Sequence, residues 1–244
     1  MEYCEHMDNT NWTFRYGEGE FPPGTDSYLL SDFPRLRRGA AVCDLGCGAG
    51  FLELLLLRRE PTLRLTGVEI REGGCRFARR NVAENGLEDR ISIVNADLCQ
   101  PEQLPPAGSF DLVVSNPPYF DTARGVASPD SARRLVREEA NCTLRDVCAA
   151  AARLLRWGGS FCMVHKTDRL TDLCCTMREA GVEPKRLQLV QKQPGKAPAL
   201  VLIEGRRGGK PGMAVEPPLL LVSSSGADSA QNTGIYFQHT EEYK

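Results

Sequence analysis

The sequence lacks the features that mark membrane, secreted and zinc-clamped proteins. None of its apolar runs approaches the roughly 20 residues that a helix needs to cross a bilayer, so we expect no membrane segment. The first residues are acidic where a secretory signal has a basic start and an apolar stretch, so we expect a cytoplasmic protein. Ten cysteines are present, but no pair has the CxxC spacing of a zinc clamp. With only three histidines as well, we predict no metal site.

Neither sign of charge is in large excess, because the formal net charge is −2. This near balance argues against indiscriminate binding to nucleic acid. The charges are nevertheless unevenly placed: residues 1–32 hold seven acids and one base, whereas residues 185–210 are strongly basic. This basic stretch predicts either a phosphate-facing surface or a solvated strand and hairpin rim. Lys185 and Arg186 within it are candidate substrate-binding residues.

Short apolar, β-branched runs alternate with helical stretches from residue 41 to about residue 205, which predicts an α/β fold with a doubly wound sheet. Seven strands are expected, at residues 41–46, 63–70, 90–96, 110–116, 159–166, 185–192 and 198–205. Helices are expected at residues 51–59, 71–85 and 167–180. A further helix is expected after Thr143, which is placed to form a capping pair with Asp146.

The length of 244 residues suits one large domain. Residues 37–205 are expected to form this domain. Residues 1–36 are expected to form an N-terminal arm and first helix, with the arm's aromatic and proline residues laid over the open end of the sheet. Residues 206–244 are expected to form a C-terminal extension that packs on the same domain and adds one strand, at residues 217–223.

A glycine-rich turn follows the first expected strand, at Gly46-Cys47-Gly48-Ala49-Gly50. Glycine lets the backbone take positive φ angles and lets a ligand approach the main chain closely. The spacing is GxGxG, whereas dinucleotide-binding folds place their third glycine one residue later. This detail disfavours NAD or FAD as the ligand.

Three acidic residues end three successive expected strands. Asp44 precedes the glycine-rich turn, Glu69 lies 19 residues after Gly50, and Asp97 closes the third strand. Glu69 is placed to accept both hydroxyls of a ribose, and Asp97 to accept the amino group of an adenine. Each acid alone is equally consistent with a turn cap. At one sheet edge, the three together predict a site for a nucleoside-bearing cofactor.

The fourth expected strand leads into Asn116-Pro117-Pro118-Tyr119-Phe120. The two prolines make this loop rigid and poor in N–H donors. An amino group conjugated to a ring is a poor nucleophile, because its lone pair is delocalised. Acceptors at Asn116 Oδ1 and the Pro117 carbonyl would bind its two N–H groups and free the lone pair, and Tyr119 would stack on the ring. The loop therefore predicts methyl transfer to such a nitrogen, with Asn116, Pro117, Pro118 and Tyr119 as the catalytic residues.

With these elements in place, the chain resembles class I methyltransferases and, more narrowly, the bacterial tRNA1(Val) adenine-37 N6-methyltransferase family. The resemblance is carried by residues 22–33, 68–70, 79–91, 110–120, 154–170 and 183–187. It implies a Rossmann-like, seven-stranded, mostly parallel sheet, S-adenosyl-L-methionine as cofactor, and methylation of adenine N6 in tRNA. One departure is visible, since the family usually shows Arg-His-Glu where this chain has Arg137-Glu138-Glu139.

The resemblance and the residue patterns together define the candidate sites. The cofactor-binding candidates are Asp44, Gly46, Gly48, Gly50, Glu69, Ile70, Asp97, Leu98 and Asn116. The substrate-binding candidates are Tyr119, Phe120, Lys185 and Arg186. The expected partner is a tRNA substrate. Membrane association and a stable protein partner are not expected.

Two other functions stay open. The first is a glutamine N5-methyltransferase acting on protein, because an amide nitrogen is also planar and conjugated. Enzymes of that kind usually carry a helical domain before the sheet, and only about 40 residues precede the first strand here. The second is a non-catalytic RNA-binding module that has kept the fold. A DNA adenine methyltransferase is disfavoured, because the chain leaves little room for a target-recognition domain.

Overall fold

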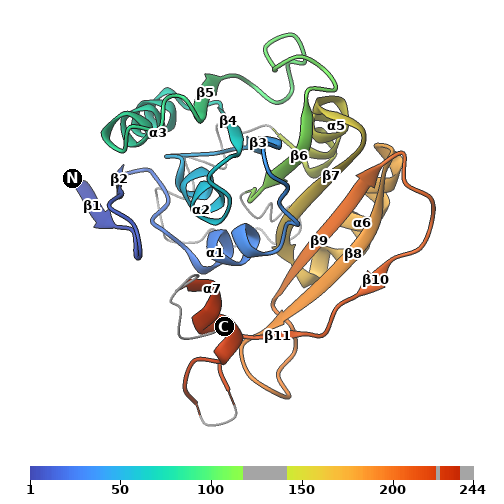
Figure 1. The fold of residues 1–244 in the computed structure, drawn as a ribbon. Coiled ribbons are helices and arrows are strands. Elements are labelled where there is room, and N and C mark those ends of the chain that lie inside the picture. The colour runs from blue at the N-terminus through green and yellow to red at the C-terminus, as the bar shows by residue number, and fades with distance from the viewer. Residues whose placement is uncertain (118–141, 224–225, 237–244) are drawn as a thin grey trace.

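A nine-stranded mixed β-sheet forms the centre of the computed structural model, which describes residues 1–117, 142–223 and 226–236 (Figure 1). Its strands lie in the order β10-β8-β9-β7-β6-β3-β4-β5, and β11 also pairs with β8. Their bounds are β3 Ala41–Leu45, β4 Arg64–Glu69, β5 Ile91–Asn95, β6 Phe110–Ser115, β7 Leu155–Lys166, β8 Val182–Gln191, β9 Leu200–Arg207, β10 Ala214–Val215 and β11 Leu219–Leu220. The seven expected strands are confirmed as β3 to β9.

The sheet is parallel except at β9, which runs antiparallel to both β7 and β8. Because β3 pairs with β4 on one side and with β6 on the other, the strand order reverses at the β3–β6 boundary. Ligands of doubly wound sheets bind beside such a reversal, outside the carboxyl ends of the strands. The predicted fold class is confirmed, and the short strands β10 and β11 widen the sheet beyond seven strands.

Helices cover both faces of the sheet, and alternate residues of each strand pack against them. One core joins the sheet to α1 (Thr25–Asp32) and α2 (Phe51–Arg59), and the other joins it to α5 (Leu144–Leu154) and α6 (Leu170–Glu179). The expected helix 71–85 is α3 (Glu72–Glu84), and a 3-10 turn, Thr167–Arg169, leads into α6. None of the helices in the described residues is long and apolar enough to cross a membrane.

Three of the expected helix boundaries have the local structure that their sequences indicate. Thr143 and Asp146 form a reciprocal capping box at the start of α5, which confirms the predicted pair. Gly86 and Gly181 follow α3 and α6 with φ angles of 66° and 81°, the left-handed conformation that ends many helices.

The N-terminal arm folds into a hairpin that the sequence analysis did not predict. Strand β1 (Glu2–His6) pairs with β2 (Thr13–Gly17), and the hairpin lies against α3. Asn81 of α3 accepts from the Arg15 amide through Oδ1 and donates through Nδ2 to the carbonyls of Arg15 and Ala49. This one buried amide therefore joins the hairpin to the glycine-rich turn.

The C-terminal extension ends in a helix, α7 (Ala230–Tyr236), that packs on α1 (Figure 1). The Tyr236 hydroxyl donates to Thr25 Oγ1 over 2.8 Å, and its ring lies 4.3 Å from that of Tyr28, centroid to centroid. The extension also supplies the strand that was expected within residues 217–223, as β11. The helix α7 was not expected.

Candidate functional site

The carboxyl ends of β6, β3, β4 and β5 carry most of the candidate residues. Asp44 is the last but one residue of β3, Glu69 ends β4, Asp97 follows β5, and Asn116 follows β6. Since these four strands are parallel neighbours, all four side chains belong to the same edge of the sheet. The structure thus brings together residues that the chain spreads over more than seventy positions.

The glycine-rich turn has the backbone conformation that its sequence predicts. Gly46, Gly48 and Gly50 have φ angles of 82°, 55° and 87°, which side chains rarely tolerate. The amides of Gly46 and Cys47 both donate to the Val68 carbonyl of β4, at 2.8 and 3.1 Å. The turn therefore bends over the end of β4 before α2 begins at Phe51.

Glu69 is held in a network of donors at the end of β4. Its Oε2 accepts from the Gly48 amide at 2.9 Å, and its Oε1 accepts from the Arg71 amide at 2.8 Å. Arg71 also forms ion pairs with Glu69 and with Glu20 of the N-terminal arm, at 3.2 and 2.8 Å. The carboxylate is thus fixed in position, and its contact with a ribose stays a prediction.

Asp44 forms a second acidic feature together with Glu53, beneath the glycine-rich turn. Both side chains are buried, and Asp44 Oδ1 and both carboxyl oxygens of Glu53 have no hydrogen-bond partner within the described residues. Burial, with the neighbouring Glu53 as the next cause, raises the pKa of Asp44 well above its ordinary value. Burial likewise raises the pKa of Glu53. An uncompensated acid pair of this kind favours a cationic group nearby.

A cavity of about 530 Å³ opens above this pair. One wall comes from the glycine-rich turn, one from the arm and α1, and the rest from the end of β6 and from Lys166 of β7. The lining residues include Phe21, Pro22, Pro23, Gly24, Thr25, Ser27, Asp44, Gly46, Gly48, Asn116, Pro117 and Lys166. Residues 21–24 of the arm line this cavity, whereas the hairpin packs against α3.

Asn116 is anchored from α1. Its Nδ2 donates to Ser27 Oγ of α1 at 3.3 Å. This bond orients the amide so that Oδ1 is the atom left to accept from a ligand. Just before it, Ser115 Oγ donates to the Leu45 carbonyl at 2.8 Å and ties the ends of β6 and β3 together. The other predicted loop residues, Pro118, Tyr119 and Phe120, lie outside the described residues, as does the segment Arg137-Glu138-Glu139.

The cofactor candidates Ile70, Asp97 and Leu98 do not line the cavity, and neither do Gly50 and Glu69. Asp97 Oδ1 accepts from the Cys99 amide at 2.8 Å, and Leu98 lies between them in the loop after β5. Ile70 follows Glu69 and is exposed, and its carbonyl accepts from Asn95 Nδ2 at 2.9 Å. A ligand that reaches from the cavity to Asp97 would have to extend past Glu69 along the sheet edge.

The two basic substrate candidates lie away from the cavity, because β9 and β7 separate β8 from β6. Arg186 pairs with Glu204 at 2.8 Å, and its guanidinium lies 3.9 Å over the Phe33 ring. Lys185 donates to the carbonyls of Lys210 and Gly212. Both cations thus have partners within the chain, and their contact with a substrate stays a prediction.

Sequence reasoning missed three residues that shape the site. Lys166 and Ser27 line the cavity, and Glu53 faces Asp44 below it. Glu53 is the single acid in the apolar run FLELLLL at the start of α2. This break in the apolar pattern was the sequence signal that could have identified it. Ser27 belongs to the segment 22–33 that carries the family resemblance, whereas Lys166 gave no signal of its own.

Comparison with protein families matches residues 15–174 to the methyltransferase small domain. Among curated proteins, a tRNA1(Val) (adenine(37)-N6)-methyltransferase of Porphyromonas gingivalis is 32% identical over 189 residues, which cover 75% of this chain and 73% of that protein. The protein of the same name from Aeromonas hydrophila is 32% identical over 186 residues and 76% of each chain.

Among solved structures, a predicted O-methyltransferase from Agrobacterium tumefaciens superposes with a TM-score of 0.70 at 20% identity, covering 86% of this chain and 95% of its own. Geranyl diphosphate C-methyltransferase from Streptomyces coelicolor, solved with S-adenosyl-L-homocysteine, gives 0.52 at 14% identity, with 74% and 78% covered. At these identities the likeness concerns the fold alone.

Proposed function

Because the chain belongs to the methyltransferase small domain family and to the family of tRNA1(Val) (adenine(37)-N6)-methyltransferases, we propose that it methylates adenine N6 in tRNA with S-adenosyl-L-methionine as the methyl donor. Adenine 37 of tRNA1(Val) is the proposed target. The observation that carries the proposal is the position of Asn116 and Pro117 on the wall of a cavity that also contains Asp44 and the glycine-rich turn.

The cavity fits the proposed cofactor. S-adenosyl-L-methionine supplies a methyl group on a sulfonium and also carries an ammonium, so it brings positive charge. Asp44, buried with an oxygen that lacks a partner within the described residues, suits such a group. The positive φ angles at Gly46, Gly48 and Gly50 let the ligand touch the main chain. Glu69 would receive the ribose, and Asp97 with Leu98 the adenine of the cofactor.

The acceptor nitrogen would bind at the end of β6. Asn116 Oδ1 and the Pro117 carbonyl accept its two N–H groups, and Ser27 keeps the Asn116 amide from turning over. Pro118 and Tyr119 complete the proposed loop, with Tyr119 stacked on the base. Because the barrier falls mainly through alignment of the nitrogen with the methyl carbon, no strong base is needed.

Glutamine N5-methylation of protein is the second candidate function, because the same acceptors would hold an amide nitrogen. The relatives at 32% identity favour RNA. A non-catalytic RNA-binding module is disfavoured by the retained Asp44, Glu69, Asp97 and Asn116. We further propose that the protein works in the cytoplasm without a stable protein partner, and that residues 37–205 form the methyltransferase domain, with residues 1–36 and 206–244 as arm and extension.

Treating total bacterial tRNA with the purified protein and S-adenosyl-L-methionine tests the proposal. Mass spectrometry of the nucleosides should show N6-methyladenosine, and nuclease mapping should place it in the anticodon loop. Methyl label in protein and none in RNA would favour the glutamine function. No binding of the cofactor by calorimetry would refute catalysis of either kind.

A further inference from the structure

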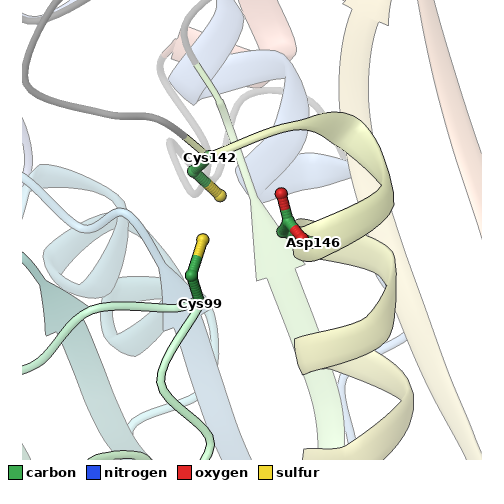
Figure 2. A group of neighbouring side chains, drawn as sticks. All are labelled: Cys99, Cys142 and Asp146. Carbon is green, nitrogen blue, oxygen red and sulfur yellow. The ribbon is translucent and has the colours of Figure 1, made fainter.

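Three side chains from two parts of the fold meet beside the cofactor edge of the sheet, and none of them lines the cavity. Cys99 comes from the loop after β5, Cys142 from the residue before the cap of α5, and Asp146 from the first turn of α5. One sulfur or carboxylate oxygen from each lies within 4.8 Å of the others. Figure 2 shows the two sulfur atoms pointing toward each other, with the Asp146 carboxylate alongside.

We propose that Cys99, Cys142 and Asp146 bind a zinc ion. Two thiolates and one carboxylate are ligands for a borderline-soft divalent cation, whereas Mg²⁺ and Ca²⁺ prefer oxygen alone. Zinc–ligand bonds of about 2.0–2.3 Å place the ligand atoms of a tetrahedral site roughly 3.5–3.8 Å apart. The observed spread of up to 4.8 Å requires only small side-chain rotations to reach this geometry. Water would complete the coordination.

The structure leaves the required atoms accessible. All three residues are half-buried, so the cluster is neither fully buried nor fully exposed to solvent. Asp146 uses Oδ2 to accept from the amide and the hydroxyl of Thr143, at 2.8 and 2.6 Å, which fixes the carboxylate and leaves Oδ1 for a cation. Cys99 is fixed from its backbone, because its amide donates to Asp97 Oδ1.

The thiolate, and not the thiol, is the form of cysteine that binds a metal. Zinc binding would therefore release the protons of the Cys99 and Cys142 thiols beside the Asp146 carboxylate.

Zinc at this place would fasten the loop that carries Asp97 and Leu98 to the start of α5. The sequence shows no zinc pattern, because the two cysteines are far apart in the chain and neither belongs to a CxxC pair. The site does not depend on the proposed function, since none of its three ligands is assigned to the cofactor or to the acceptor nitrogen.

Cobalt titration of the reduced, full-length protein tests the inference. One equivalent of Co²⁺ should produce sulfur-to-metal charge-transfer absorption, and Zn²⁺ should remove it. Loss of an outer-sphere partner commonly lowers metal affinity 10–100-fold, so Cys99→Ser and Cys142→Ser should each lower it by about 100-fold or more. Asp146→Asn should weaken cobalt binding, while its amide oxygen can still accept from Thr143 in the cap of α5. Cys175→Ser, at an exposed cysteine, is the matched control and should bind normally.

Hydrogen exchange gives a second measurement that does not depend on absorption. Zinc should slow exchange of the amides from Asp97 to Gln100 in the wild type and in Cys175→Ser, and leave Cys99→Ser unchanged. Circular dichroism establishes that each variant is folded. The inference is wrong if no charge-transfer band appears, if the band survives in Cys99→Ser, or if Cys175→Ser loses it. It is equally wrong if mass spectrometry finds a Cys99–Cys142 disulfide in place of metal uptake.

Discussion

The carboxyl group of Asp44 at the end of β3 lies against that of Glu53 in the first turn of α2, and both are fully buried beneath the glycine-rich turn. Asp44 belongs to the wall of the cavity, whereas Glu53 does not reach it. A residue outside the cavity therefore influences the protonation of one inside it. Two of the predictions below follow from this pair.

Glu53→Gln should stabilise the protein near neutral pH. Burial raises the pKa of Glu53 from 4.5 to about 7. Below pH 4.5 the folded and unfolded states both hold this proton. Between about pH 4.5 and 7 only the unfolded chain releases it, so the free energy of unfolding falls as the pH rises, by on the order of 3 kcal/mol in total. Glutamine does not ionise, so the variant does not lose this stability as the pH rises.

Denaturant unfolding of both proteins at about pH 5 and pH 8 measures this effect. The variant should gain stability over the wild type mainly at the higher pH. Glu88→Gln, at an exposed glutamate, serves as the control and should follow the wild type. An equal shift at both pH values would mean that packing, and not ionisation, distinguishes the two side chains.

Affinity for S-adenosyl-L-methionine should rise with pH from about 5.5 to 8. The folded pair holds its proton at the low end, because the pKa values of both acids are raised. A cationic ligand prefers the ionised pair, so binding at low pH must also remove a proton, at a cost of up to tenfold in affinity per pH unit. Calorimetry in two buffers of different ionisation enthalpy detects this proton release. S-adenosyl-L-homocysteine, which lacks the sulfonium charge, should show a weaker dependence, and identical profiles would contradict the idea.

Gly67→Ala should destabilise the protein, because a Cβ on β4 would overlap Glu53 Oε1 and come within 2.7 Å of Cys47 Sγ. Overpacking of this kind costs about 1–3 kcal/mol. Glu53→Ala removes one of the two clashing groups, so a double-mutant cycle should show a favourable coupling of at least about 0.5 kcal/mol. Purely additive effects would show that Glu53 does not lie on Gly67.

Asn116→Ala should lower the rate of methyl transfer to tRNA by about 100-fold or more and leave cofactor affinity unchanged. The size follows from the loss of one aligned hydrogen bond to the reacting group. Ser27→Ala should have a smaller effect of the same kind, because Asn116 keeps its side chain but loses the anchor at Nδ2. Single-turnover rates and calorimetry separate the two effects.

Asn11→Ala, at an exposed asparagine, is the matched control and should transfer methyl groups at the wild-type rate. If Asn116→Ala lost cofactor binding together with transfer, the end of β6 would be structural. If Ser27→Ala equalled Asn116→Ala, the anchor and not the acceptor would limit the rate.

Much of the fold could be predicted because its signals are local. Alternating apolar strands, the glycines that end α3 and α6, and the Thr143–Asp146 cap each depend on residues close together in sequence. The hairpin β1–β2 and the helix α7 have little apolar periodicity, and their contacts with α3 and α1 come from distant parts of the chain. Sequence patterns alone do not show such contacts.

The candidate site divides in the same way. Asp44, Glu69 and Asn116 could be placed because parallel strands end at a common edge. Glu53, Ser27 and the cluster of Cys99 with Cys142 could not, because each depends on the exact packing of a helix or loop against that edge. For Lys185 and Arg186 the sequence showed a cluster of positive charge but not the partners within the chain that these two side chains contact.

The hydrogen bond from Tyr236 to Thr25 joins residues 211 positions apart, and Thr25 belongs to the wall of the cavity. Closing so long a loop carries a large entropic cost, which nearby contacts must offset before the bond forms. The cavity wall is therefore expected to be completed late in folding, after the sheet has formed. A ribosome would have to release the chain through Tyr236 before this wall reached its final form.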